Sequence, residues 1–333
     1  MLPKVLVTGA GGFLGRHLVE QLRQRGYPVR ALVRPGVAAT SALAALSSRP
    51  IEVWEGDVAQ LPTLKGAADG CGAIIHAAAL AQVNPARNPA VWVANLTGTE
   101  NVLQLARQAG ISRFVYVGTA NVFGFGTKEQ PGDETRPYAG RSYGLDYMDS
   151  KRAATDVVLQ AAAREQLPAV LVHPTFMLGP GDAKPTSNAL LLELYRGKLP
   201  GYPPGGKNYV HVRDVAVATV NALTQGWVGE SYILGNQNLS YHEAFALMAR
   251  VLGVAAPRWP IPAGLASLYG HFCDLQARLT GRPAQLNSAM AAVANDGHYF
   301  RVDKARTELN LPQTDLETAI AEAFHWFKAH DYA

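Results

Sequence analysis

Residues 8–15 read Thr-Gly-Ala-Gly-Gly-Phe-Leu-Gly, between an apolar segment that predicts a strand and a segment that predicts a helix. The first glycine of the G-x-x-G-x-x-G spacing permits a tight turn, the second lets backbone approach a pyrophosphate, and the third lets helix and strand pack closely. Because a helix N-terminus offers free N–H groups and partial positive charge, the stretch predicts a dinucleotide site. The residues expected to contact the dinucleotide here are Gly9, Gly11, Gly12, Phe13, Leu14 and Gly15.

Outward from this stretch, short apolar segments alternate with helix-length segments, which is the pattern of a parallel sheet covered by helices. We therefore expect an α/β fold, a Rossmann-type doubly wound parallel sheet over residues 1–173. Helices are predicted at Phe13–Arg25, Ala90–Gln108 and Tyr143–Glu165. The predicted strands are Lys4–Thr8, Val29–Val33, Ile51–Trp54, Ala73–His76, Phe114–Val117 and Ala169–Val172.

Beyond residue 173 the composition changes, and Gly179–Asp182 and Leu199–Gly206 are rich in glycine and proline. We expect a smaller, mostly helical C-terminal substrate lobe made of residues 174–208 and 236–333, with residues 209–235 returning to the dinucleotide-binding domain. The elements predicted here are helices at Leu190–Arg196, Val212–Leu223, His242–Leu252 and Asp315–Lys328 and a strand at Tyr232–Leu234.

The bulk composition is that of an ordinary globular protein, with 48% hydrophobic and 17% charged residues in 333. The net charge of +4 is spread without a run of lysine and arginine, so no nucleic-acid partner is expected. Cys71 and Cys273 lack metal-type spacing, so neither a metal site nor a disulfide framework is expected. With no signal-peptide pattern and no apolar run of roughly 18 residues, the sequence predicts no membrane span and a cytoplasmic location.

Cofactor choice is predicted from the end of the second strand. Enzymes that prefer NAD usually have an acidic residue there, about 20 residues after the glycines, which binds the ribose 2′-hydroxyl. This chain has Arg34, whose planar guanidinium suits a 2′-phosphate. NADP(H) is therefore the preferred cofactor, and NAD(H) is the alternative. Asp57 and Val58, after the third strand, are expected near the adenine ring.

Tyr147 and Lys151 lie four residues apart and share one face of a predicted helix. This helix lies between the fifth and sixth strands, so both side chains can reach the strand ends where ligands bind. Carbonyl reduction needs a hydride at carbon and a proton at oxygen, and a phenol with a pKa of about 10 needs a nearby cation to ionise more readily. Tyr147 is thus predicted to be the acid and base, helped by Lys151. Thr119, just past the fifth strand, is predicted to orient the same substrate oxygen.

Motifs along nearly the whole chain resemble the extended short-chain dehydrogenases/reductases, the NAD-dependent epimerase/dehydratase family. The subgroup most resembled contains dihydroflavonol-reductase-like, hopanoid-associated epimerase-like and 3β-hydroxysteroid-dehydrogenase-like proteins. The motifs are Thr8–Gly15, Gly56-Asp57-Val58, His76-Ala77-Ala78-Ala79, residues 93–99 (VANLTGT), 117–124 (VGTANVFG), Tyr147–Lys151, His173-Pro174-Thr175 and residues 209–215 (YVHVRDV).

The resemblance implies that Thr119, Tyr147 and Lys151 form the catalytic triad and that Lys151 also holds the nicotinamide ribose. By the same resemblance Ala77 and Ala78 line the path of the cofactor, Asn95 supports the site, and Pro174 starts the backbone that meets the nicotinamide carboxamide. The sequence departs from the sugar 4,6-dehydratases, which have Asp-Glu where this chain has Ala120 and Asn121. Water elimination is therefore not expected. In a second departure, Arg213 stands where many relatives have aspartate.

Substrate contacts are predicted at Thr119, Asn121, Tyr143 and Lys207. Tyr143 lies one helical turn before Tyr147, and Lys207 lies where sugar epimerases resemble one another in using arginine on a diphosphate. His76 and His211 are interpreted as structural. An apolar group in the second lobe is predicted to be core or the wall of an apolar pocket; it comprises Trp259, Leu265, Leu268, Tyr269 and Phe272.

Three functions remain open on this sequence. The first is an NADPH-dependent carbonyl reductase, or the reverse alcohol dehydrogenase, acting on a small or fairly apolar molecule. The second is a nucleotide-sugar epimerase with tightly bound NAD, and the third is a non-catalytic dinucleotide sensor.

A homodimer through Ala90–Gln108 and Tyr143–Glu165 is a further hypothesis, because such four-helix contacts are common among the proteins that the chain resembles.

Overall fold

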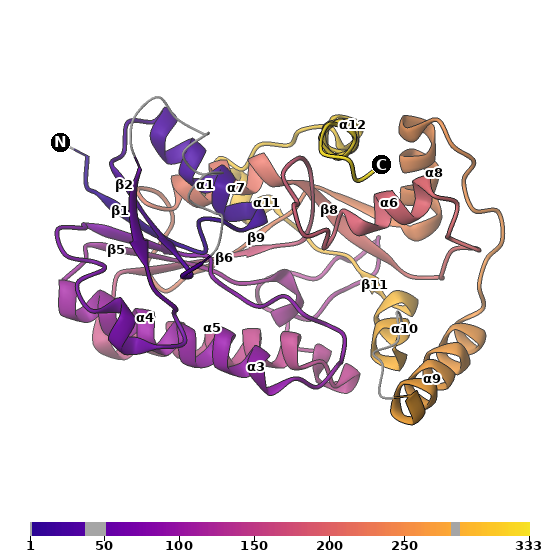
Figure 1. Ribbon diagram of the computed structural model, residues 1–333, viewed down its shortest axis with the longest axis horizontal. Helices are drawn as coiled ribbons and strands as arrows, with labels where there is room; N and C mark the ends of the chain where they lie inside the picture. The colour runs from indigo at the N-terminus through magenta and orange to yellow at the C-terminus, as the bar shows by residue number, and fades with distance from the viewer. Residues whose placement is uncertain (1, 37–50, 281–286) are drawn as a thin grey trace.

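The computed structural model describes residues 2–36, 51–280 and 287–333. Its larger sheet has seven parallel strands in the order β3-β2-β1-β4-β5-β6-β9 (Figure 1). The predicted α/β class is confirmed, and the predicted strands match to within two residues at each end. The strands are β1 (Val5–Thr8), β2 (Val29–Val33), β3 (Glu52–Glu55), β4 (Ala73–His76), β5 (Arg113–Val117), β6 (Ala169–Pro174) and β9 (Ser231–Leu234).

Helices cover both faces of this sheet, because alternate side chains of each strand point to opposite faces. Val5 and Val7 of β1 pack with α1 and α7 on one face, whereas Leu6 packs with α4 and α5 on the other. Figure 1 shows α1, α7 and α11 above the sheet and α3, α4 and α5 below it. The helices are α1 (Phe13–Gln24), α3 (Pro89–Trp92), α4 (Gly98–Ala109), α5 (Asp146–Glu165), α7 (Val212–Asn221) and α11 (Asp303–Glu308).

Two helical predictions need correction. The segment predicted as one helix over Ala90–Gln108 contains a π-helical turn at Val93–Thr97 between α3 and α4. The helix predicted from Tyr143 begins only at Asp146, because Gly144 adopts a left-handed conformation (φ 64°) after a separate 3₁₀ turn at Gly140–Tyr143. Further 3₁₀ turns lie at Leu61–Leu64 and Ala120–Val122.

The C-terminal region is less helical than predicted, because it contains a four-stranded mixed sheet. Its central strand β8 begins at Gly206, in a stretch that the glycine and proline content had predicted to be a loop. Within the segment 209–235, β9 joins the larger sheet and α7 packs on α1, whereas β8 belongs to the small sheet. The small sheet consists of β7 (Phe176–Leu178), β8 (Gly206–His211), β10 (Gln237–Ser240) and β11 (Gly297–His298).

The remaining helices belong to the C-terminal region (Figure 1). One core joins α6, α8 and α12 to β7 and β8, and α9 packs on α10 at the opposite end of the region. In the described residues, no helix combines the length and apolar character needed to cross a bilayer. The helices are α6 (Ala189–Tyr195), α8 (Tyr241–Leu252), α9 (Ala263–Thr280), α10 (Ser288–Asn295) and α12 (Leu316–Ala329).

The apolar group predicted to be core or pocket wall is instead exposed. Trp259 is 74% exposed, and Leu265, Leu268, Tyr269 and Phe272 are each more than half exposed. The prediction was wrong because hydrophobic periodicity identifies the apolar face of a helix but not whether another element covers it.

Candidate active site

The glycine turn forms a backbone cradle at the N-terminus of α1. Gly9 has a left-handed φ of 72°, and a Cβ there would lie 2.7 Å from the backbone nitrogen of Ala78. A Cβ on Gly15 would lie 2.0 Å from the Gly9 carbonyl oxygen, so helix and turn can pack this closely only with glycine. Gly12 caps α1 without a side chain, and Gly11 and Gly12 are exposed. Such an open, uncapped helix start fits the pyrophosphate of a dinucleotide.

A chain of buried hydrogen bonds fixes the segment that faces this turn. His76 lies between the hydroxyls of Thr8 and Thr99, at 2.7 Å from Nδ1 and 3.1 Å from Nε2. The Ala78 backbone nitrogen donates to the Thr8 hydroxyl at 3.2 Å. Burial, reinforced by the positive charge of Lys151, lowers the pKa of His76 to about 3, so the ring stays neutral. His76 therefore supports the position of Ala77 and Ala78 and is not available as an acid or base.

Asn95 joins the loop after β4 to α5. It lies in the π-helical turn, a local widening that is frequent at functional sites. Its Oδ1 accepts from the Leu80 nitrogen at 2.7 Å, and its Nδ2 donates to the Ser150 hydroxyl at 3.0 Å. Ser150 in turn donates to the Tyr147 carbonyl oxygen at 3.0 Å. The predicted supporting residue thus holds the backbone that carries Tyr147.

Lys151 is buried where β5 ends. Its Nζ donates to the Val117 carbonyl oxygen at 2.7 Å and lies 4.5 Å from the centre of the Tyr116 ring. Burial lowers the pKa of Lys151 to about 7, because the charged ammonium loses solvation that one carbonyl and one ring do not replace. The hydrogen bond fixes the lysine at the end of β5, and Thr119 follows Val117 by two residues in the chain.

Tyr147 lies one helical turn before Lys151, on the same face of α5. Burial raises the pKa of Tyr147, and a hydrogen bond with the Thr119 hydroxyl lowers it by a smaller amount. The structure therefore brings together the three residues predicted to be catalytic. In the protein alone the phenol holds its proton at neutral pH, which is the form needed to donate it.

The other residues predicted to bind the cofactor differ in whether their side chains are exposed, hydrogen-bonded or packed within the protein. Arg34 follows β2, is exposed, and makes no hydrogen bond or ion pair within the described ranges. Asp57 uses one carboxylate oxygen to accept from the Ala59 nitrogen at 2.9 Å. Val58 is buried against Gly98 of α4, so its side chain is a packing contact. Pro174 ends β6 opposite Leu234 of β9, at the same edge of the sheet as Thr119.

A cluster from both parts of the chain lies beside Tyr143. The Tyr143 hydroxyl donates to Asp296 and lies 3.4 Å from Nε2 of His298. The His298 ring packs against Phe125 with centroids 4.3 Å apart, and its Nδ1 has no hydrogen-bond partner in the described structure. Sequence reasoning missed Asp296 and His298, since they follow Tyr143 by some 150 residues and no local motif marks them.

Lys207 lies next to this cluster, in register with His298 across β8 and β11. Its ammonium lies 5.6 Å from the centre of the Phe176 ring and has no acidic partner among the described residues. Burial lowers the pKa of Lys207 to about 8. Asn121, also predicted to contact substrate, lies in the 3₁₀ turn capped by Thr119 and is only partly buried.

Helix α10 places apolar side chains next to Tyr147, the tyrosine predicted to be catalytic. Ala289 and Val293 of α10 share one cluster with Tyr143 and Tyr147. This cluster also includes Leu145 and Met148 of the α5 region. Within the described residues no set of three metal-ligating side chains comes together.

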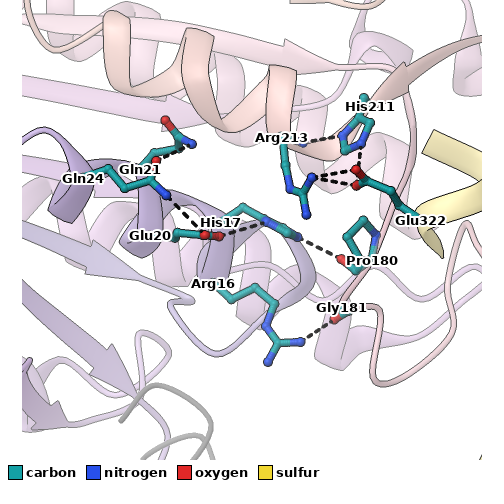
Figure 2. Close-up of polar contacts among 10 residues, drawn as sticks. All are labelled: Arg16, His17, Glu20, Gln21, Gln24, Pro180, Gly181, His211, Arg213 and Glu322. Carbon is teal, nitrogen blue, oxygen red and sulfur yellow. Dashed lines mark hydrogen bonds and ion pairs between the residues drawn. The ribbon is translucent and has the colours of Figure 1, made fainter. Parts of the chain in front are cut away.

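Polar contacts shown in Figure 2 connect the dinucleotide helix to the C-terminal region. His17 and Arg16 of α1 bond the Pro180 and Gly181 carbonyl oxygens at 2.8 and 3.2 Å. On α7, Arg213 pairs with Glu322 at 2.7 Å, and Glu322 also lies 3.2 Å from His211. Arg213 therefore anchors α12, which gives a structural reason for arginine at this position. His211 belongs to the same contact and is structural.

Residues 5–235 match the NAD dependent epimerase/dehydratase family. The chain belongs to this family. It is an NAD(P)-dependent oxidoreductase of the extended short-chain dehydrogenase/reductase type. A putative dihydroflavonol 4-reductase of Synechocystis sp. is 33% identical over 98% of this chain and 95% of that protein.

Two further relatives extend the comparison. The 4-hydroxy-2-methyl-3-oxo-4-farnesyl-3,4-dihydroquinoline-1-oxide ketoreductase of Stigmatella aurantiaca is 32% identical over 92% of this chain and 91% of that protein. The crystal structure of PA4631, described as a nucleoside-diphosphate-sugar epimerase from Pseudomonas aeruginosa, superposes with a TM-score of 0.82 at 26% identity and covers 99% of both chains. The family thus includes both reductases and epimerases on this fold.

Proposed function

We propose that this member of the epimerase/dehydratase family is an NADPH-dependent carbonyl reductase for an apolar ketone or aldehyde. The observation that carries the proposal is the arrangement of Thr119, Tyr147 and Lys151 at the strand ends beside the glycine cradle. Bound there, the nicotinamide would supply the hydride that carbonyl reduction requires. The remaining requirements fall to side chains of this chain.

Tyr147 is the proton donor in this proposal. Its burial keeps the phenol protonated, and Thr119 lies on its hydroxyl side, where it can orient the substrate oxygen. Lys151, held on the Val117 carbonyl, places a cation where it favours the phenolate left after proton transfer. Asn95 and Ser150 hold the backbone of Tyr147 and act as positioning residues.

NADP(H) is proposed over NAD(H) because of Arg34. The end of β2 has this exposed arginine in place of an acidic residue, and the guanidinium is not committed to another described side chain. An arginine at this place can bind a 2′-phosphate with two charge-assisted hydrogen bonds. Its interaction with the neutral 2′-hydroxyl of NAD is much weaker.

An apolar substrate is proposed from the apolar side chains that cluster with Tyr147 and from the relatives. Ala289 and Val293 lie in one cluster with Tyr143 and Tyr147, and Phe125 lies near Tyr143. The ketoreductase of Stigmatella aurantiaca carries a farnesyl-bearing dihydroquinoline in its name. Ala120 and Asn121 replace the acidic pair that a sugar dehydratase uses, which argues against elimination chemistry.

The proposal is tested by titrating the purified protein with NADPH and NADH and then following NADPH oxidation with long-chain and aromatic ketones and aldehydes. We expect tighter binding of NADPH, and turnover that requires a carbonyl substrate. Equal affinity for both cofactors would contradict the NADP(H) assignment alone. Absence of NADPH oxidation with every carbonyl compound would contradict the reductase assignment.

Nucleotide-sugar epimerisation is the second candidate, favoured by one observation. Lys207 offers a partly buried cation without an acidic partner in the described structure, and a sugar diphosphate is one group that it could bind. This candidate predicts a protein purified with NAD and conversion of a UDP- or dTDP-sugar without net cofactor oxidation. Either result would replace the reductase proposal.

A homodimer through α4 and α5 belongs to this proposal as well. Both helices lie on one face of the large sheet, and Val93 in the π-helical turn before α4 is 48% exposed. Size-exclusion chromatography with light scattering should give twice the chain mass of 35.6 kDa. A monomeric mass would contradict it.

A further inference from the structure

Helix α9 exposes its large apolar side chains and buries its small ones. Six large residues follow one face at helical spacing, and each is between 54% and 80% exposed. The opposite face, with Gly270 and Cys273, is buried. A Cβ on Gly270 would lie 2.8 Å from the Ser288 Cα, so the small face is packed closely on α10. The outer face of α9 consists of Leu265, Leu268, Tyr269, Phe272, Leu275 and Leu279.

The exposure is built into the fold, because polar contacts fix which face of α9 points inward. Asp274 accepts from the Ser288 nitrogen at 3.2 Å. Asn295 of α10 donates to the Ala263 carbonyl and to the Ser267 hydroxyl, each at 3.3 Å. Rotation of α9 that hid the apolar face would break these bonds. A contiguous apolar surface that is held outward in this way marks an interaction site.

We propose that the outer face of α9 binds the surface of a lipid bilayer that contains anionic lipids. The segment 255–280 has two arginines, Arg258 and Arg278, and one acidic residue, Asp274, which gives it a net charge of +1 with histidine neutral. The single carboxylate is turned toward α10 by its bond to Ser288. Apolar residues flanked by arginine are the combination that binds an anionic membrane interface.

The aromatic residues agree with a lipid surface. Trp259, four residues before the start of α9, is 74% exposed, and Tyr269 on the outer face is 59% exposed. Tryptophan and tyrosine favour the boundary between headgroups and acyl chains, because each has an apolar ring and one polar group. A second copy of this chain fits the face less well, since pairing two copies would bring two positively charged segments together. Because α9 is not a membrane-spanning helix, it would lie in the plane of the interface.

The position of α9 connects this surface to the active site. Helix α9 packs on α10 in Figure 1, and α10 contributes Ala289 and Val293 to the cluster that includes Tyr147. Packed helices lie about 8–10 Å apart, so the bilayer would be separated from the catalytic tyrosine by roughly two helix layers. A substrate dissolved in the bilayer would then have a short path to the site. Membrane binding itself does not depend on the reductase proposal.

The test is sedimentation of the full chain with vesicles of phosphatidylcholine alone and of phosphatidylcholine mixed with phosphatidylglycerol. The test variant is Leu268→Ser/Phe272→Ser, which changes only exposed side chains. Trp227→Ser/Val228→Ser is the matched control, because these residues are 72% and 50% exposed elsewhere on the molecule. Thermal melting of each variant would show that all remain folded.

We expect wild type and the control to bind the anionic vesicles, with weaker binding in high salt and to phosphatidylcholine alone. The test variant should lose about tenfold or more in partition coefficient, since two large apolar side chains no longer enter the interface. Quenching of tryptophan fluorescence by brominated lipid should also fall in Trp259→Phe. Equal binding by the test variant, or no binding by wild type, would overturn the proposal. A dimer in light scattering that the test variant converts to monomer, without vesicle binding, would assign the face to a second copy instead.

Discussion

The surroundings of Tyr147 and those of Lys207 differ in how their polar groups are satisfied. Around Tyr147, Asn95, Ser150 and Lys151 each have a partner within the protein. In the small sheet, Lys207 has no acidic partner and His298 keeps one ring nitrogen unpaired, considering the described residues. The hydrogen bonds of Asn95, Ser150 and Lys151 hold the first environment in place without substrate, whereas Lys207 and His298 have hydrogen-bonding capacity left over in the second. We interpret the difference as a division between fixed chemistry at the large sheet and substrate recognition at the small one.

The largest effect should come from Tyr147→Phe, which tests whether chemistry belongs to the large sheet. Losing the proton donor should lower kcat by about 10²–10⁴-fold while NADPH affinity stays within a few fold. Tyr143→Phe is the matched control, because Tyr143 lies four residues earlier, in the 3₁₀ turn before α5, and bonds Asp296 in the second environment. A smaller loss of kcat in Tyr147→Phe than in Tyr143→Phe would reverse the division that we draw.

Lys151→Met should change the pH dependence of stability. The pKa of Lys151 is about 7 in the folded protein against 10.5 ordinarily, so between these values the unfolded chain binds more protons and stability rises with pH. At pH 6 the folded protein must hold the buried charge. The variant should therefore be more stable than wild type there by roughly 2–4 kcal/mol, with the gain shrinking by pH 9.

Urea denaturation of the cofactor-free protein at pH 6 and pH 9 measures this difference. Lys184→Met is the control, since Lys184 is exposed, and it should give no such gain. If Lys151→Met destabilised the protein equally at both pH values, Lys151 would not be an uncompensated buried charge.

Arg34→Ala should sharpen the comparison by separating cofactor choice from chemistry. Loss of the guanidinium removes the charge-assisted bonds to a 2′-phosphate, so KM for NADPH should rise about 10- to 100-fold. The KM for NADH should barely change, because NADH lacks the 2′-phosphate. NADH is therefore the internal control. Steady-state kinetics with both cofactors would decide, and an equal rise for both would remove Arg34 from the 2′-phosphate site.

The smallest expected effect is that of Lys207→Met in the small sheet. Removing one donor to the substrate should raise KM for the carbonyl compound about 5- to 10-fold and leave kcat and KM for NADPH nearly unchanged. A loss confined to kcat would instead make Lys207 part of the chemistry. The measurement is a full substrate titration at saturating NADPH.

The features that the sequence predicts are those marked by local motifs, whereas contacts between residues far apart in the chain are not predicted. The glycine turn and the pair Tyr147 and Lys151 are local motifs, so the cradle, the large sheet and the spacing on α5 were predictable. The small sheet was not, because β11 has only two residues and pairs with β8 some 90 residues earlier. Nor was His298, whose neighbour Tyr143 is distant in sequence. The outer face of α9 has the same periodicity that a buried helix would have.

The central claim is tested most directly by deuterium transfer from C4-deuterated NADPH to an apolar ketone. We predict one deuterium at the carbinol carbon of the product, one NADP⁺ released for each product formed, and labelled product that accumulates about 10²–10⁴-fold more slowly in Tyr147→Phe. Transfer to none of the carbonyl compounds, together with NAD that remains bound through purification and isomerises a nucleotide sugar, would contradict the account.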